Sequence, residues 1–255
     1  MQERAETTRK AVLEAAAHLF FERGYVATSI SDITALSGRT SGAIYFHYGN
    51  KEQLALAVVQ AHFATWPEVI GRYTTAPGPA LERLVRLSFA VAREFRDNIV
   101  VRAGARLWSE RRAIAVTMPP PFVDWIDTVE RILVQAGEEG ELAVHADPRR
   151  DAHSVVAAFF GLHTVSDALD SRLLIEERLA DLWRLLLPGL QACPAAEHLL
   201  RRARGPVPVR ATGAGAVPAP AADAAPEPGP VPGAGPLPQG RPLPDAARVP
   251  GAAPS

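Results

Sequence analysis

The chain has 255 residues, of which 47% are hydrophobic and 22% are charged, and its formal net charge is −1. This composition indicates a soluble globular protein of one or two domains, and its near-neutral charge excludes a uniformly basic nucleic-acid binder, so any basic surface has to be local. The sequence contains neither an apolar run of the roughly 20 residues that span a bilayer nor the apolar stretch of a secretory signal, and Cys193 is its single cysteine. We therefore expect a cytoplasmic protein with no membrane partner, disulfide, metal or cofactor.

Helical periodicity runs through residues 1–205 without a convincing alternating strand, and it predicts an all-α fold. The first helix is predicted at 4–22, where apolar residues recur on one side, and Gly24 supplies its C-terminal turn. After residue 49, breakers rich in Pro and Gly separate six further predicted helices, at 50–72, 79–96, 98–110, 120–138, 149–170 and 175–190.

The segment at 28–51, TSISDITALSGRTSGAIYFHYGNK, has the pattern of a helix-turn-helix. Ser29 and Asp32 form a capping-box start for a short helix. Gly38 follows, where a left-handed turn costs little only for glycine, and Thr40 can cap a second short helix. Such a pair presents its second helix to the major groove, so the segment predicts a three-helix DNA-binding domain at the N-terminus.

The second short helix and its flanks carry residue types that contact DNA. Hydroxyl, imidazole and ammonium groups donate to phosphate oxygens. The phosphate contacts predicted on this basis are Thr28, Tyr45, His47 and Lys51. Small residues at the helix start allow close approach, and base-edge contacts are predicted for Ser41 and Ala43, beside Gly42. The competing interpretation makes Tyr45, Phe46 and Tyr48 core aromatics and His47 a solvated side chain.

The segment FFERGYVATSISDITALSGRTSGAIYFHYGNKEQL resembles the DNA-binding head of the TetR family. The resemblance implies a homodimer whose two heads read successive major grooves of a palindrome-like, double-stranded DNA operator. The matching elements are Gly24-Tyr25, the helix start from Thr28 to Ile33, Gly38, the run from Gly42 to Tyr48, and Asn50-Lys51.

Two positions depart from the pattern of that family. Arg39 stands where a buried Val is usual, and Ser41 stands where Lys or Arg is frequent. The long side chain of Arg39 can extend outward and replace the lost charge. We therefore include Arg39 and Thr40 among the predicted DNA contacts.

Four later segments resemble the gamma-butyrolactone receptor subgroup of the same family: LERLVRLSFAVAREF, VRAGARLW, PPPFVDWIDTVERIL and DLWRLLLPGL. The resemblance implies release from DNA by a small signalling lactone or butenolide, with Trp125 against the ligand. An indole suits that role because its ring packs on an acyl chain while its N–H donates to a carbonyl oxygen. The open alternatives are that Trp125 is a core aromatic, and that the regulator answers an antibiotic, another metabolite or no ligand.

Three more residues are candidates for a pocket with apolar walls and a few polar groups. His62 offers a polar contact at the junction between the predicted domains, and Phe89 and Phe160 offer apolar walls. Each of the three is also compatible with an ordinary core position.

The helices predicted at 149–170 and 175–190 have wide apolar faces, which we expect to pair with their symmetry mates in a four-helix dimer interface. The same side chains can instead pack inside one subunit. The residues assigned to this interface are Val155, Val156, Phe159, Phe160, Leu162, His163, Leu179, Leu182, Trp183 and Leu186.

The segment from Pro206 to Ser255 holds 14 of the 23 prolines and no aromatic residue, so it has too little apolar surface to order itself. We expect a disordered Pro/Ala/Gly-rich tail. The predicted domains are a DNA-binding head at 1–52, a helical ligand-binding and dimerisation body at 53–200, and the tail at 201–255.

The sequence favours a sequence-specific DNA-binding repressor, released from its operator by a small apolar ligand, over an enzyme. It contains no zinc-protease motif, nucleophile elbow, Walker loop or dinucleotide fingerprint. A helical interaction module that does not bind DNA is the remaining alternative.

Overall fold

The computed structural model describes residues 2–120, 122–193 and 195–204, which form ten α-helices and one short 3₁₀-helix. The only β-type pairing in this part of the chain is an isolated bridge between Leu142 and Gln191. The predicted all-α fold is therefore confirmed. None of the described helices is both long enough and apolar enough to cross a membrane. The predicted tail from residue 206 onward lies outside the described residues.

The seven helices predicted outside the helix-turn-helix match the observed helices to within three residues at each end. They are α1 (Gln2–Arg23), α4 (Lys51–Thr74), α5 (Ala80–Asp97), α6 (Ile99–Ser109), α7 (Val123–Glu138), α8 (Pro148–Asp170) and α9 (Ile175–Leu190). The helix-turn-helix comprises α2 (Ile30–Ser37) and α3 (Ser41–Tyr48), and the 3₁₀-helix is η1 (Arg111–Ala113). One helix, α10 (Ala196–Arg204), corrects the prediction, because it continues past the expected start of the tail at residue 201.

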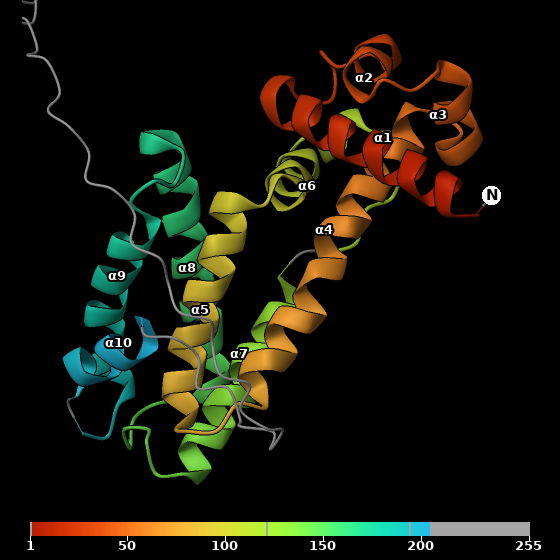
Figure 1. Cartoon of the computed structure of the whole chain (residues 1–255). Coiled ribbons are helices and arrows are strands. Elements are labelled where there is room, and N and C mark those ends of the chain that lie inside the picture. The colour runs from red at the N-terminus through yellow and green to blue at the C-terminus, as the bar shows by residue number, and fades with distance from the viewer. Residues whose placement is uncertain (1, 121, 194, 205–255) are drawn as a thin grey trace, which may run out of the picture. The chain divides into compact units, whose positions relative to one another are not determined.

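The head consists of α1, α2, α3 and the start of α4, and Figure 1 shows it at one end of the described chain with α6 beside α1. Its core forms where Phe20 of α1, Ile33 of α2 and Ile44 of α3 meet, all fully buried. Leu107 of α6 is fully buried in the same core. The core of the head therefore includes a helix from beyond the predicted boundary at residue 52.

The central helix of the body is α5, which packs against α4, α7, α9 and α10. Nearly every side chain between Ala80 and Ala92 is buried. A helix whose buried positions run round most of its circumference is covered on several sides at once. Four body helices therefore surround α5, while α8 packs on α7 and α9, and the position of α5 among its neighbours is visible in Figure 1.

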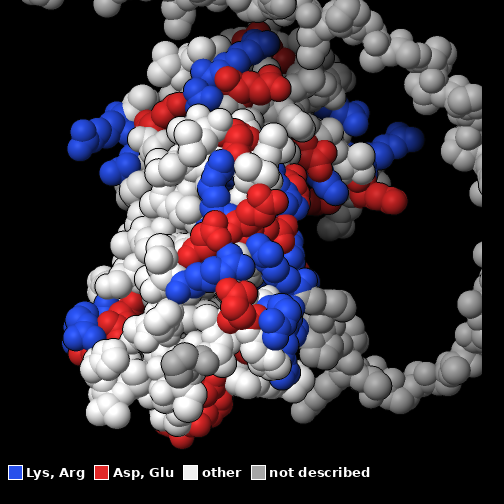
Figure 2. Space-filling view, turned by 90° about the vertical axis from the view of Figure 1, so that its left-hand side faces the viewer, with Lys and Arg blue, Asp and Glu red and all other residues white. Residues whose placement is uncertain are grey.

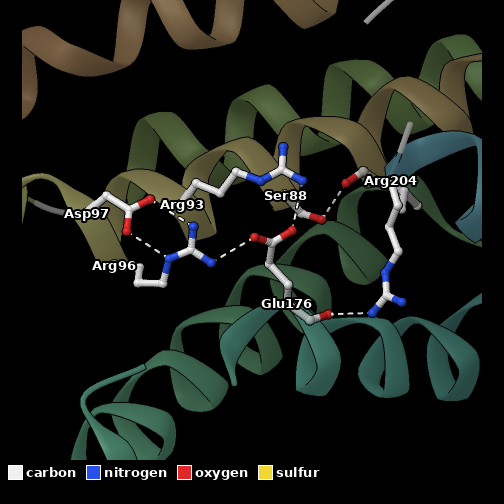
Figure 3. A network of polar contacts seen from close by, with 7 residues as sticks. Ser88, Arg93, Arg96, Asp97, Glu176 and Arg204 are labelled. Carbon is white, nitrogen blue, oxygen red and sulfur yellow. Dashed lines mark hydrogen bonds and ion pairs between the residues drawn. The ribbon is translucent and has the colours of Figure 1, made fainter. Parts of the chain in front are cut away.

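A polar network ties α9 and α10 to α5 (Figure 3). The carboxylate of Glu176, at the start of α9, accepts hydrogen bonds from Arg93 and from Arg96, each at 2.8 Å. The carbonyl oxygen of Glu176 accepts from Arg204 Nη2 of α10 at 3.0 Å. The partners that hold α10 in place thus lie far away in the sequence, which explains why local composition does not reveal this helix.

The structure corrects the predicted dimer interface. Five of the assigned side chains are buried within one subunit, where they belong to the core formed with α5 and α7: Val155, Val156, Phe159, Leu179 and Trp183. The large apolar side chains that α8 and α9 expose are Val165, Leu169 and Leu185. Figure 2 views the molecule from the side on which α9 and α10 lie in Figure 1, and there basic and acidic residues are interspersed beside uncharged areas.

Candidate DNA-recognition helix and ligand cavity

Side-chain caps fix the starts of α2 and α3, and a glycine fixes the turn between them. Ser29 Oγ accepts from the Asp32 backbone N–H at 3.1 Å, and the Asp32 carboxylate accepts from the Ser29 N–H at 2.9 Å, which is the capping box expected from the sequence. Gly38 has φ 64°, the left-handed turn conformation. Thr40 Oγ1 then accepts from the Ala43 N–H at 3.2 Å and starts α3.

The two faces of α3 differ sharply. Ile44 and Tyr48, one turn apart, are buried in the head, and Tyr48 Oη donates to the Arg9 carbonyl oxygen at 2.8 Å. On the other side Tyr45 is 52% exposed and Phe46 is 82% exposed. The helix therefore has one anchored face and one free face.

The predicted DNA contacts on and before α3 lie on or beside its free face. Thr40, Ser41, Gly42 and Tyr45 are exposed, and Arg39, Ala43 and His47 are half-buried. Phe46 was not among the predicted contacts, although its ring is the most exposed aromatic of the head. The inward spacing of Ile44 and Tyr48 places Phe46 on the opposite side of the helix, and this was the available signal.

Thr28 requires a correction. Its side chain is only 1% exposed, and its hydroxyl group donates within the head to the carbonyl oxygens of Gly24 at 2.8 Å and Leu19 at 3.2 Å. A hydroxyl that closes the end of α1 is not available to a phosphate oxygen. Thr28 therefore fixes the path of the chain from α1 to α2.

Lys51 also has a different role from the predicted one. Its Nζ donates to the carbonyl oxygens of Tyr25 and Thr28, both at 2.9 Å, and lies 4.2 Å from the centre of the Tyr25 ring. The Tyr25 hydroxyl donates to Glu52, and burial raises the pKa of Tyr25 to about 12. Lys51 thus holds the α1–α2 loop against the start of α4.

The main cavity has a volume of about 630 Å³ and lies where α1, α4 and α6 meet α7 and α8. Much of its wall is aromatic and includes Trp108, Phe122, Trp125 and Phe160. The rings of Phe122 and Phe160 are 4.7 Å apart, and those of Trp108 and Phe122 are 5.9 Å apart. A cavity of this size with apolar walls is typical of a site for a small organic molecule.

Three of the four predicted ligand residues line this cavity: Trp125, Phe160 and His62. Trp125 and Phe160 also border a smaller apolar cavity of about 40 Å³ between α5, α7, α8 and α9. Phe89 requires a correction, because its ring is fully buried within the core and has the Arg204 guanidinium 5.6 Å from its centre. It packs between α5 and α10 and is not part of the cavity wall in the described structure.

His62 joins α4 to α6. Its Nδ1 donates to the Val101 carbonyl oxygen at 3.0 Å, and its Nε2 accepts from Trp66 Nε1 at 3.4 Å. Burial lowers the pKa of His62 to about 4, so the ring is neutral at physiological pH. A Cβ atom on Gly104 of α6 would lie 2.3 Å from the Cβ of His62, so the two helices meet at this glycine.

The polar part of the cavity wall is formed by residues that the sequence does not single out as ligand contacts. Arg102 comes from α6, His163 and Asp167 from α8, and Arg172 from the turn after α8. His163 is 3% exposed, and burial, reinforced by the charge of Arg172, lowers its pKa to about 3. Arg102 lies about 60 positions before the other three in the sequence, and only the tertiary fold brings all four to one cavity.

Two further cavity residues, Arg106 of α6 and Glu110 directly after it, also hold the end of α1. Arg106 Nη1 donates to the Phe21 carbonyl oxygen, and Glu110 Oε2 accepts from the Tyr25 backbone N–H at 2.7 Å. The two side chains pair with each other at 2.9 Å. Gly24, with φ 82°, leaves room for them, since a Cβ there would lie 2.8 Å from Glu110 Oε1. The cavity wall is therefore bonded directly to the head.

Both the N-terminal head and the helical body of this chain resemble known proteins. Residues 12–58 match the family described as bacterial regulatory proteins, tetR family, and residues 78–192 match the tetracyclin repressor-like C-terminal domain. The A-factor receptor protein of Streptomyces griseus is 33% identical over 198 residues, which cover 78% of this chain and 69% of the relative.

Two solved structures extend the likeness to three dimensions. One, described as the molecular basis for control of antibiotic production by bacterial hormones, is 43% identical with a TM-score of 0.67, and the match covers 72% of this chain and 98% of the other. The second is a gamma-butyrolactone receptor described as ArpA-like, which is 32% identical with a TM-score of 0.67, and the match covers 78% and 96%.

Proposed function

Because the chain belongs to the TetR family of bacterial regulatory proteins, we propose that it is a DNA-binding repressor that leaves its operator when a small, largely apolar ligand enters the 630 Å³ cavity. The single observation that carries this proposal is the double role of Arg106 and Glu110, which line the cavity and hold the end of α1. A ligand that displaces either side chain acts directly on the head.

The DNA contacts come from the free face of α3 and its start. Ser41 and Ala43 reach base edges, while Tyr45 and His47 contact phosphates, with Arg39 supplying a positive charge near the turn. The exposed ring of Phe46 adds an apolar contact, for which a thymine methyl group is a suitable partner. Backbone N–H groups at the start of α3 favour a phosphate as well.

Two copies of the chain are needed to read a palindrome-like operator. The support for a dimer is the apolar surface that α8 and α9 expose, with Val165, Leu169 and Leu185 as its large side chains. Exposed apolar residues on neighbouring helices favour pairing with a second copy, in a four-helix contact. The two heads then face successive major grooves of one duplex.

The ligand packs its apolar part against the aromatic wall, where Trp125 and Phe160 lie. The gamma-butyrolactone receptor among the similar structures favours a lactone with an alkyl chain as the starting candidate. An antibiotic or another metabolite of similar size fits the same apolar wall, so the release assay has to include both kinds of compound.

Release follows from a shift between two states of the head. The ligand binds better when α6 has moved away from its position against α1, and the heads then no longer match two grooves together. A coupling of about 1–3 kcal/mol, which is typical of such regulators, changes operator affinity roughly 5- to 150-fold.

The experiment starts from fragmented genomic DNA. The full chain is incubated with the fragments at moderate salt, the retained DNA is sequenced, and the recovered operator is then titrated with a panel of alkyl-substituted γ-butyrolactones. Retention of a palindrome-like motif and its release by one or more lactones are the expected results. Retention of no sequence above background would overturn the proposed DNA-binding function, and release by no compound of either kind would overturn the ligand response.

A further inference from the structure

We infer that the ligand of this cavity carries one carboxylate, which pairs with Arg102 next to His163 and Arg172, in addition to the apolar body that contacts the aromatic wall. This inference rests on the proposed function, since it uses the same cavity. The inference restricts the class of ligand from small apolar molecules in general to those with an acidic group. It therefore favours an open-chain hydroxy acid over the corresponding neutral lactone.

The first argument is the charge balance of the cavity wall, which contains three arginines and two carboxylates. Arg106 pairs with Glu110 at 2.9 Å, and Arg172 Nη1 lies 2.7 Å from Asp167 Oδ1. Arg102 forms no ion pair with any described residue. The wall therefore holds one positive charge in excess, which matches a ligand with a single negative charge.

The surroundings of Arg102 support the same conclusion. Its guanidinium lies 3.9 Å from the centre of the Phe21 ring, which orients the group without using its N–H donors. The charge of Arg102 also acts on the Asp97 carboxylate, but both oxygens of Asp97 accept hydrogen bonds from Arg96, at 2.8 Å each. A guanidinium with unused donors is suited to bind a planar carboxylate with two hydrogen bonds.

The neighbours of Arg102 also have unused polar atoms. His163 is 3% exposed, and both of its ring nitrogens lack a hydrogen-bond partner among the described residues. Arg172 is 8% exposed, and its Nε likewise has no partner there. Buried polar groups in native proteins are nearly always paired, so a cluster of unpaired ones beside a cavity indicates a polar ligand group.

The three groups line the same cavity. Burial is the main cause of the lowered pKa of both His163 and Arg172; the charge of Arg172 adds to the shift of His163, and the charge of Arg102 adds to that of Arg172. His163 and Arg172 both approach the Phe95 ring, with centre distances of 4.8 Å and 5.8 Å. A carboxylate bound here relieves the repulsion between the two arginines and gains charge-assisted hydrogen bonds in a partly dry site.

The test compares two probes with the same carbon skeleton. γ-Decalactone is neutral, and its ring-opened form, 4-hydroxydecanoate, carries one carboxylate at pH 7.5. Binding of each to the full chain is measured by calorimetry. We expect the acid to bind at least about tenfold more tightly than the lactone, as charge-assisted hydrogen bonds to a half-buried arginine allow.

Two variants assign the preference to Arg102. Arg102→Gln should weaken binding of the acid about tenfold and change that of the lactone by less than about twofold. Arg112→Gln, which removes an exposed arginine outside the cavity wall, should change neither.

Equal or tighter binding of the lactone by the unmodified chain would overturn the carboxylate inference without affecting the proposed repressor function, and this comparison requires no variant to fold. Binding of neither probe would overturn the cavity as a ligand site. An unchanged affinity for the acid in Arg102→Gln would overturn the assignment to Arg102.

Discussion

Arg106 of α6 donates from Nη1 to the carbonyl oxygen of Phe21 in α1, and both residues line the same cavity. A carbonyl group at the C-terminal end of a helix has no partner within the helix, and a guanidinium satisfies it while complementing the helix dipole. The bond therefore stabilises the end of α1 only while α6 keeps its position. A ligand that moves Arg106 removes this support from the helix that carries α2 and α3.

Arg106→Met should uncouple the cavity from the head. The apolar side chain lacks the bond to Phe21, so the variant should resemble the ligand-bound state: we expect operator binding without ligand to weaken about fivefold, which corresponds to about 1 kcal/mol of coupling, and the further release caused by the most effective lactone to shrink by the same factor. Operator affinity by fluorescence anisotropy, with and without saturating ligand, measures both quantities. Arg131→Met, on the exposed side of α7, is the control, and an undiminished ligand effect in Arg106→Met would contradict the mechanism.

Phe46→Ala should weaken operator binding without destabilising the protein. The ring is 82% exposed, so its removal costs little folding free energy, within about 0.5 kcal/mol. The lost apolar contact with DNA should reduce affinity about tenfold, since full burial of a Phe side chain contributes about 1.5–3 kcal/mol and partial burial correspondingly less. Val144→Ala, at a fully exposed apolar residue of the body, should change neither quantity. Operator affinity within twofold of the unmodified chain would place Phe46 outside the interface.

Lys51 and Arg39 should respond differently to salt. Lys51→Met removes two hydrogen bonds from an ammonium group to backbone carbonyls, so it should lower the free energy of unfolding by about 1.5–3 kcal/mol and leave the salt dependence of operator binding unchanged. Arg39→Gln should reduce the slope of log K against log salt by about one for each subunit, because a phosphate contact is lost. Urea unfolding measures the loss of stability in Lys51→Met, and operator binding at several salt concentrations measures the loss of a phosphate contact in Arg39→Gln. A reduced slope in a fully stable Lys51→Met would restore Lys51 to the DNA interface.

Gly104→Ala should force α4 and α6 apart. Its Cβ would lie 2.3 Å from the Cβ of His62, a distance that requires movement of the helix backbones, so we expect a loss of about 1–3 kcal/mol in the free energy of unfolding. Gly71→Ala in α4, where nothing lies within 4 Å, should instead stabilise the protein by about 0.5–1 kcal/mol. Equal stability of the two variants in urea would show that the helices separate without cost.

The stability of the protein should fall in acid because of its buried histidines. The pKa of His163 is lowered to about 3 and that of His62 to about 4, against an ordinary value of 6.5, so the unfolded chain binds more protons than the folded one between those limits. The free energy of unfolding therefore decreases as the pH falls from about 6.5 towards 4. His163→Leu should flatten this dependence by up to one proton, and His153→Leu, on the exposed side of α8, should not. An identical pH dependence in His163→Leu would mean that His163 titrates normally in the folded state.

The sequence correctly predicts the structural features that depend on residues close to one another in one helix. Ile44 and Tyr48 are one turn apart, and their spacing correctly predicts the buried face of α3. Ser29 and Asp32 are three residues apart, and their capping box is present as expected. In each of these cases the interacting groups lie within a few residues of one another.

The same reasoning fails where the partner comes from elsewhere in the chain. Phe89 and Phe160 both lie on amphipathic helices, yet only the packing of neighbouring helices decides that Phe160 borders the cavity while Phe89 lies under α10. Thr28 and Lys51 have residue types suited to phosphate, but carbonyl groups made available by the fold of the α1–α2 loop bind them first. A polar residue type indicates what a side chain can bind, and the tertiary structure decides which partner it meets.

The burial of Leu107 among side chains of α1, α2 and α3 limits how this protein can be recombined with others. A chimera joined near residue 52 would pair the DNA-binding head with a foreign α6. The side chains of that helix would not match the core of the head, and apolar gaps or clashes would result. Exchanging operator specificity between related proteins therefore requires either transplanting α6 together with the first helices or redesigning its contact surface. Engineered sensors built on this scaffold should therefore place the junction after Ser109, the last residue of α6.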